Sequence, residues 1–207
     1  HAFFNERAVG NLPELKGVAP RPLKAIGVIG GGTMGAGIAT AALLAGMQVV
    51  LIEMKDDAVE AAKGRIGGNL QGALKRGKIS QDAFDMMTTK ALTVSTNYGT
   101  LKDVDLVIEA VFEEMSVKKD VFGKLDAVCK PGCVLASNTS YLDVNEIAAS
   151  TSRPTDVIGL HFFSPAHVMK LLEVVVADQT APDVVATGFA LGKALGKVSV
   201  RAGVCDG

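Results

Sequence analysis

A glycine-rich segment near residue 30 constrains the fold of this chain more than any other feature. The segment reads Gly-Gly-Gly-Thr-Met-Gly from Gly30 to Gly35 and contains the spacing G-x-G-x-x-G. It follows a short apolar run at residues 25–29 and opens an Ala- and Leu-rich stretch at residues 33–45, which Gly46 can end. A strand, a glycine turn and a helix in this order form the context in which such a loop binds a dinucleotide.

Each part of the segment has its own expected task. Gly30 permits a tight turn, Gly32 lets the backbone approach a pyrophosphate, and Gly35 allows close packing of helix on strand. Thr33 and Met34 open the helix, whose free N–H groups and partial positive charge favour phosphate. We therefore expect the segment to bind the pyrophosphate of a dinucleotide.

The expected dinucleotide is NAD rather than NADP. Glu53 ends the second apolar run, residues 48–52, and no Arg follows it directly. A carboxylate at this place accepts hydrogen bonds from ribose hydroxyls and repels a 2′-phosphate. The alternative is a solvated Glu at the end of a strand.

Apolar runs and helical patterns alternate along the rest of the chain. Residues 56–90 are expected to form two helices, with a break near Gly77 and an N-cap at Ser80. The alternation predicts an α/β fold: a Rossmann-type, doubly wound, mainly parallel sheet with a helical-hairpin excursion. Strands are expected at 25–29, 48–52, 92–94, 105–109, 134–137, 157–160, 171–176 and 197–200, and further helices at 33–45, 115–128, 144–149 and 182–195.

The first 22 residues differ from those that follow. Residues 1–8 could form two helical turns, whereas Pro13, Gly17, Pro20 and Pro22 disfavour regular structure after them. We expect a linker at residues 1–22, with an artificial terminus as the other interpretation, and one NAD-binding domain at residues 23–207.

Composition excludes several classes of partner. A net charge of −1 without a dense basic stripe argues against nucleic acid, and the apolar stretch at 38–44 is too short to span a membrane. The first residues lack signal-peptide anatomy, and an odd number of cysteines (Cys129, Cys133 and Cys205) indicates a reducing compartment. No second ligand pair accompanies Cys129 and Cys133, so no metal site is expected. We expect an intracellular protein, cytoplasmic as in bacteria or peroxisomal, and not secreted.

Acidic residues follow the predicted strand at 105–109. Glu109 would lie where carboxyl ends of parallel strands line a ligand crevice, and could approach the ribose or the nicotinamide of the cofactor. The alternative is that it caps the helix beginning near Met115. The residues leave both possibilities open.

Three further polar positions point to catalysis. Ser140 lies in a hydroxyl-rich loop after the strand at 134–137, and His161 is placed just beyond the strand at 157–160. Glu173 interrupts an apolar run and needs a partner, because burying a lone carboxylate is costly. A carboxylate bound to one imidazole nitrogen makes the other a better base, so His161 and Glu173 fit removal of a hydroxyl proton. A structural histidine is the alternative.

Four motifs in order resemble the L-3-hydroxyacyl-CoA dehydrogenases of fatty-acid β-oxidation. They are Gly-Val-Ile-Gly-Gly-Gly-Thr-Met-Gly, Ala-Ser-Asn-Thr-Ser, Leu-His-Phe-Phe-Ser-Pro and Met-Lys-Leu-Leu-Glu-Val, and the similarity runs from about Leu23 to Gly207. The resemblance implies that His161 is the general base, that Glu173 orients it, and that Ser140 contacts substrate and nicotinamide. It also implies that Glu53, Glu109 and Glu114 lie along the NAD.

The resemblance extends to substrate and neighbouring domains. The excursion at 56–90 is similar to the family's CoA-facing hairpin, on which Asn69 and Arg76 would contact 3-hydroxyacyl-CoA; a solvated helix face is the alternative. Residues 3–17 resemble the linker of multifunctional β-oxidation enzymes, which implies a hydratase/isomerase segment upstream. The family continues past residue 207 into an all-helical domain with a catalytic asparagine, much of the substrate cleft and the dimer contacts, so this chain alone is expected to have little or no activity.

One departure and two rival functions remain. Ser164 stands where the family often has Asn, and both residues are polar. The first rival is a different β-hydroxyacid dehydrogenase that acts on a small free acid, which CoA dependence would separate. The second is a non-catalytic NAD-binding module, in which His161 and Glu173 would be incidental.

Overall fold

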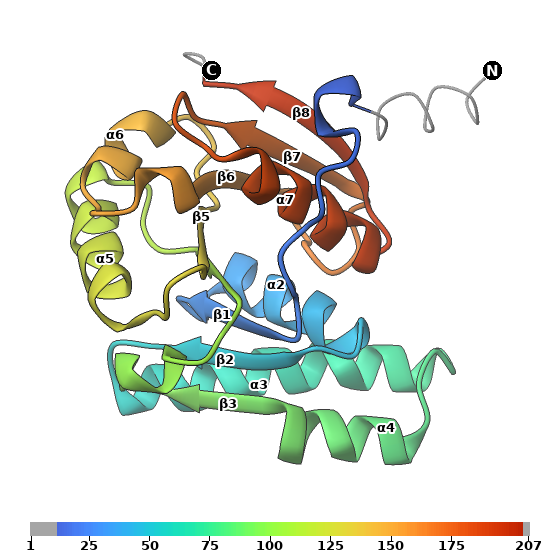
Figure 1. Ribbon diagram of the computed structural model, residues 1–207. Helices are drawn as coiled ribbons and strands as arrows, with labels where there is room; N and C mark the ends of the chain where they lie inside the picture. Colours follow the sequence, from blue (N-terminus) through green and yellow to red (C-terminus); the bar gives the residue numbers. More distant parts are fainter. Residues whose placement is uncertain (1–11, 205–207) are drawn as a thin grey trace.

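The core of the protein is one eight-stranded sheet. A computed structural model describes residues 12–204 and gives the strand order β3-β2-β1-β4-β5-β6-β7-β8 (Figure 1). All neighbouring strands are parallel except β6 and β7, so the expected mainly parallel Rossmann sheet is confirmed. The strands are β1 (Ala25–Ile29), β2 (Gln48–Ile52), β3 (Leu92–Ser95), β4 (Leu106–Glu109), β5 (Val134–Ser137), β6 (Val157–Phe162), β7 (Leu171–Val176) and β8 (Val198–Gly203).

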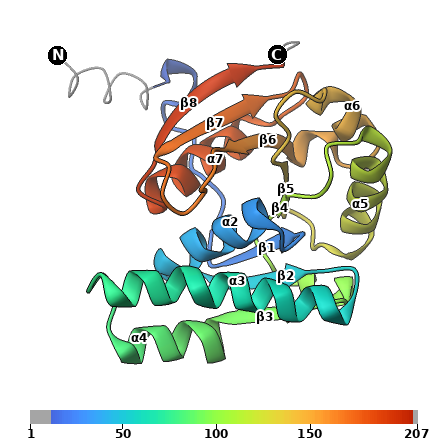
Figure 2. The same ribbon diagram turned by 180° about the vertical axis from the view of Figure 1, so that it is seen from behind.

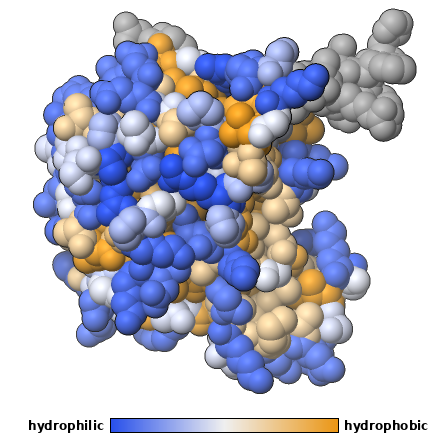
Figure 3. Space-filling model, in the orientation of Figure 1, coloured by the Kyte–Doolittle hydropathy of each residue, from blue (hydrophilic) through white to orange (hydrophobic). Residues whose placement is uncertain are grey.

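Helices cover both faces of the sheet and divide its apolar side chains into two clusters. One cluster joins the sheet to α2, α3 and α7, for example through Ile38, Ile66 and Leu191; the other joins it to α5 and α6 through Phe122 and Ile147. Hydrophilic residues cover much of the face shown in Figure 3. The helices are α2 (Thr33–Leu44), α3 (Asp56–Lys75), α4 (Gln81–Met86), α5 (Met115–Val128), α6 (Val144–Ala149) and α7 (Pro182–Ala194).

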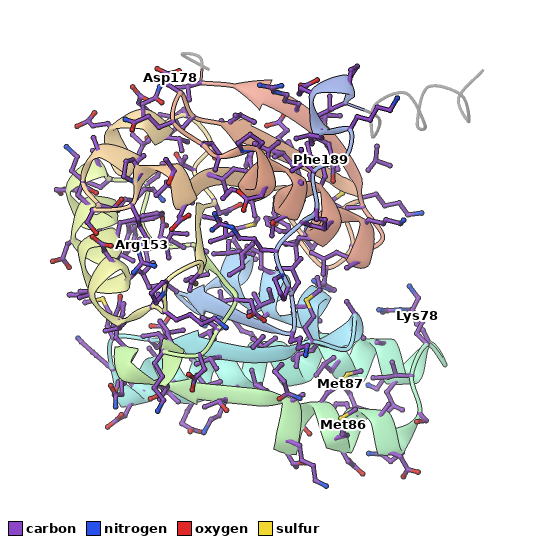
Figure 4. All side chains as sticks on the ribbon, in the orientation of Figure 1. Lys78, Met86, Met87, Arg153, Asp178 and Phe189 are labelled. Atoms are coloured by element: carbon purple, nitrogen blue, oxygen red, sulfur yellow. The ribbon has the colours of Figure 1, made fainter. Side chains whose placement is uncertain are left out.

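The helical hairpin of α3 and α4 lies beside the β2–β3 end of the sheet (Figures 1 and 2). Its turn contains Gly77 with φ +68°, and the Ser80 hydroxyl accepts a hydrogen bond from the backbone N–H of Ala83 at 3.1 Å. Lys78, labelled in Figure 4, lies at this turn. The expected break and cap are confirmed.

Strand β6 is longer than the sequence predicted. It was expected to end at residue 160, but His161 and Phe162 continue it because they pair with Glu173 and Leu172 of the antiparallel neighbour β7. His161 therefore lies within a strand and not in the loop after it. Strand β8 likewise covers 198–203 instead of 197–200.

The segment before β1 crosses the domain and is held to it by Arg21. The guanidinium of Arg21 binds Asp156 at 2.8 Å and Asp183 at 2.9 Å, and its backbone N–H donates to the Thr187 hydroxyl. The two helical turns expected at residues 1–8 lie outside the described residues. No helix within residues 12–204 combines the length and the apolarity that a membrane crossing requires.

Candidate active site

The glycine loop between β1 and α2 has no room for most side chains. Gly30 has φ +93°, and a Cβ there would lie 2.7 Å from the carbonyl oxygen of Ala110. A Cβ on Gly35 would overlap the carbonyl oxygen of Gly30. A Cβ on Gly32 would meet nothing within 4 Å, so this position faces open space. The backbone can thus approach a ligand at Gly32 while the loop stays packed behind it.

The N-terminus of α2 is available for an anion. Gly32 is the N-cap residue, and no side chain within residues 12–204 accepts a hydrogen bond from the free N–H groups of the first turn. Thr33 begins the helix, whereas Met34 is partly buried against the core. Free N–H groups beside an open glycine suit the pyrophosphate of NAD.

Glu53 follows β2 and lies against the glycine loop. Its Oε1 accepts a hydrogen bond from the backbone N–H of Gly31, and its Oε2 accepts one from Met54 at 3.2 Å. The carboxylate is therefore held at the carboxyl end of the sheet, beside the loop. This is the position in which an acidic residue accepts from the adenosine ribose.

The surroundings of Glu109 fit neither of its two expected roles, which were a contact to the cofactor and a cap of the following helix. Its side chain has 0 % exposed surface. The carboxylate accepts from Lys118 Nζ at 2.7 Å, from Ser137 Oγ at 2.7 Å and from the backbone N–H of Val111 at 2.9 Å. It lacks the exposed oxygen that a direct cofactor contact requires, and it does not cap α5, whose N-cap residue is Glu114.

Of the two adjacent glutamates before α5, Glu113 lies nearer to the predicted catalytic loop. Glu113 accepts from the Thr139 hydroxyl and from the backbone N–H of Ser140, the latter at 3.3 Å. Glu114, which the sequence had favoured, is exposed and accepts from Ser116 Oγ at 2.6 Å. An acidic cluster in a loop does not reveal which of its members faces inward, so the sequence missed Glu113.

Lys118 connects Glu109 to Glu113. Its side chain is 1 % exposed, and its Nζ lies 4.0 Å from Glu113 Oε1 in addition to the close pair with Glu109. The signal was present in the sequence, because Lys118 shares the spacing of the buried residues Val121, Phe122 and Leu125 on α5. A lysine on the apolar face of a helix predicts a buried acidic partner.

The predicted pair of His161 and Glu173 meets across β6 and β7. His161 Nδ1 lies 2.8 Å from Glu173 Oε2, and the two side chains are 18 % and 35 % exposed. The carboxylate favours the proton on Nδ1, which leaves Nε2 as the basic nitrogen. The Phe163 ring packs on the imidazole at a centroid distance of 4.5 Å.

Ser140 follows β5, the parallel neighbour of β6. The loop is attached to the histidine strand because Phe162 N donates to Asn138 Oδ1 at 2.8 Å. Thr139 supports the loop as well, since its hydroxyl accepts from Leu142 N at 2.9 Å. The fold thus places the exposed Ser140, in the loop after β5, beside the strand that carries His161.

A basic cavity of about 220 Å³ contains both residues that the sequence predicted for CoA. Asn69 lines it and donates to the Thr40 hydroxyl at 3.1 Å, and Arg76, the C-cap residue of α3, lines it as well. Burial lowers the pKa of His167, and the charges of Arg76 and Lys197 lower it further. Three lysines complete the basic lining: Lys78, Lys170 and Lys197.

Comparison with known proteins gives a consistent result. The family described as 3-hydroxyacyl-CoA dehydrogenase, NAD binding domain, matches residues 25–205. The chain is 42% identical over 209 residues to the glyoxysomal fatty acid β-oxidation multifunctional protein MFP-a of Brassica napus, covering 100% of this chain and 29% of that protein. It is also 42% identical over 212 residues to the peroxisomal bifunctional enzyme of Homo sapiens, again covering 100% and 29%. The chain thus spans less than a third of the length of these relatives.

Solved structures agree with these sequence relatives. The structure of 3-hydroxybutyryl-CoA dehydrogenase from Escherichia coli K12 superposes with a TM-score of 0.84 at 41% identity, covering 88% of this chain and 39% of that one. FadB2 of M. tuberculosis gives a TM-score of 0.85 at 37% identity, covering 89% and 65%. The similarity therefore includes the three-dimensional arrangement as well as the sequence.

Proposed function

The chain belongs to the 3-hydroxyacyl-CoA dehydrogenase family, as its NAD-binding domain, and we propose that within its parent protein it oxidises 3-hydroxyacyl-CoA to 3-ketoacyl-CoA. The observation that carries the proposal is the 2.8 Å contact between His161 and Glu173, beside the Ser140 loop. A base oriented by a carboxylate next to a nicotinamide site suits the oxidation of a secondary alcohol.

The geometry supports the following roles for the site residues. His161 Nε2 accepts the proton of the 3-hydroxyl group, while Glu173 holds the imidazole and stabilises its charged form. The Ser140 hydroxyl orients the same substrate oxygen. Bound NAD supplies the acceptor for the hydride that leaves C3. Glu53 and the glycine loop bind the adenosine ribose and the pyrophosphate, and Glu113 and Lys118 support the Ser140 loop.

The basic cavity is proposed to take the phosphates of CoA. Arg76, Lys170 and Lys197 supply positive charge, and Asn69 adds an amide at the same wall. A free hydroxyacid would have no phosphate for these residues to bind. This favours a CoA thioester over the small free acid that a related dehydrogenase would use.

The proposed parent is a multifunctional β-oxidation enzyme, with a hydratase/isomerase part upstream and a helical domain downstream that completes the cleft and forms an oligomer. The relatives named as glyoxysomal or peroxisomal proteins support a peroxisomal location. The cytoplasm, as for a bacterial-type enzyme, is the other location that we consider. Catalysis is proposed for the complete protein, and NAD binding for the chain of 207 residues.

The test compares two polypeptides: residues 1–207, and a chain extended through the helical domain. Both are titrated with NADH and assayed with acetoacetyl-CoA and NADH. We expect both to bind NADH, and only the extended chain to turn over rapidly. Equal turnover with acetoacetate, or rapid turnover by residues 1–207 alone, would contradict the proposal.

A further inference from the structure

A cation that the proposed reaction does not use contacts the glycine loop. Arg65 lies on α3, and its Nη1 donates a hydrogen bond to the carbonyl oxygen of Gly31 at 3.1 Å. The backbone N–H of the same Gly31 donates to Glu53 Oε1. One loop residue therefore connects a guanidinium and a carboxylate, on the side where the adenosine ribose would bind.

Close packing holds the backbone of α3 beside the glycine loop. Helix α3 packs against α2 (Figure 2), and a Cβ on Gly31 would overlap the Cβ of Ala62. Ala62 lies one helical turn before Arg65, so the backbone of α3 cannot shift away from the loop without opening this contact.

The guanidinium of Arg65 is available to a ligand. Arg65 is exposed, and none of the carboxylates within residues 12–204 lies within 4.0 Å of its nitrogens. Lys63, two residues earlier on the same helix, pairs with Glu60 at 2.8 Å. Arg65 thus presents free charge at the loop, whereas the charge of Lys63 is already compensated on the surface.

We propose that Arg65 is a second determinant of cofactor choice: it is placed to bind a 2′-phosphate, and Glu53 alone keeps NADP out. The inference rests on the proposed binding of the adenosine ribose beside Glu53. A guanidinium is the preferred side chain for a phosphate, since its planar fork donates two parallel hydrogen bonds. The Glu53 carboxylate repels the same phosphate, so NAD preference results from the balance of two opposite charges that both contact Gly31.

The experiment is a binding titration with NADH and NADPH, followed by nucleotide fluorescence, which needs no turnover. Glu53→Gln keeps an oxygen for the Gly31 N–H and removes the negative charge. We expect it to raise NADPH affinity by about tenfold or more, because one charge-assisted contact is gained and a repulsion is lost. Adding Arg65→Ala should remove most of that gain, whereas adding Lys63→Ala, the matched control, should keep it.

Ionic strength supplies a second readout. The NADPH affinity of Glu53→Gln should fall with added salt more steeply than that of Glu53→Gln/Arg65→Ala, because only the former retains the guanidinium. Equal NADPH affinity of the single and the double variant, or no gain in Glu53→Gln, would overturn the inference. If the unsubstituted chain failed to bind NADH, the proposed cofactor site itself would be wrong, which is a distinguishable result.

Discussion

The proposed cofactor side and the proposed catalytic side, both at the carboxyl end of the parallel strands, are built by different means. On the cofactor side, the loop from Gly30 to Gly35 works through its backbone, and a side chain on Gly30 or Gly35 has no space. On the catalytic side, the proposed functional groups are side chains, His161 and Glu173, which meet across two antiparallel strands and remain partly exposed.

The difference indicates how each side responds to substitution. Changes in a packed backbone loop alter folding and cofactor affinity together, because the loop cannot move away from an added atom. A change at a partly exposed strand residue alters the chemistry and leaves the sheet intact. The buried Lys118 lies between the two sides, since it pairs with Glu109 at the end of β4 and approaches Glu113 at the Ser140 loop.

Removing Lys118 should give the largest change in stability. Lys118→Met leaves the Glu109 carboxylate buried without its counter-charge, and we expect a loss of about 3–5 kcal/mol in the free energy of unfolding, measured with urea. Glu109→Gln/Lys118→Met is the matched control, because it removes both charges and should be clearly more stable than the single variant. Equal stability of the two variants would contradict the cost assigned to a buried Glu109 carboxylate without its counter-charge.

Two glycine substitutions should separate packing from ligand approach. Gly35→Ala should lower the free energy of unfolding by about 1–3 kcal/mol, because its Cβ overlaps the Gly30 carbonyl oxygen. Gly32→Ala meets nothing within 4 Å and should unfold at the same urea concentration as the unsubstituted chain. Its NADH affinity should nevertheless fall, because the methyl group stands where the pyrophosphate approaches. Unchanged NADH binding by Gly32→Ala would place the cofactor elsewhere.

The smallest expected effect is a dependence of stability on pH at the basic cavity that His167 lines. Burial, followed by the charges of Arg76 and Lys197, lowers the pKa of His167 below its ordinary value of 6.5. The unfolded chain then takes up a proton that the folded state resists, so this contribution is full above pH 6.5 and is lost as the pH falls through the lowered pKa. His167→Gln should reduce the loss of thermal stability between neutral and mildly acidic pH. An unchanged pH profile would contradict this.

The cofactor side was largely predictable because its signals are local. The glycines and the helix they open are contiguous, and one residue type fits each position. The catalytic pair was predictable only as a chemical need: Glu173 in an apolar run required a partner, but its register opposite His161 depends on the antiparallel pairing of β6 with β7. The same reason explains why His161 was placed in a loop.

The sequence missed positions whose role depends on which way a side chain points. Glu113 and Glu114 are chemically identical neighbours, and only the start of α5 decides which one faces Ser140. Glu109 was expected at the surface of the crevice, although Lys118 on the apolar face of α5 already indicated a buried partner. Arg65 reaches the glycine loop because α3 packs against Gly31, a contact without a local sequence signal.

The most direct test measures binding and turnover on one sample of the extended polypeptide carrying His161→Ala. We expect an NADH dissociation constant close to that of the unsubstituted protein and a rate of acetoacetyl-CoA reduction lower by about 10²–10⁴-fold. Normal turnover, or a loss of NADH binding as large as the loss of rate, would contradict the separation of cofactor and catalytic sides.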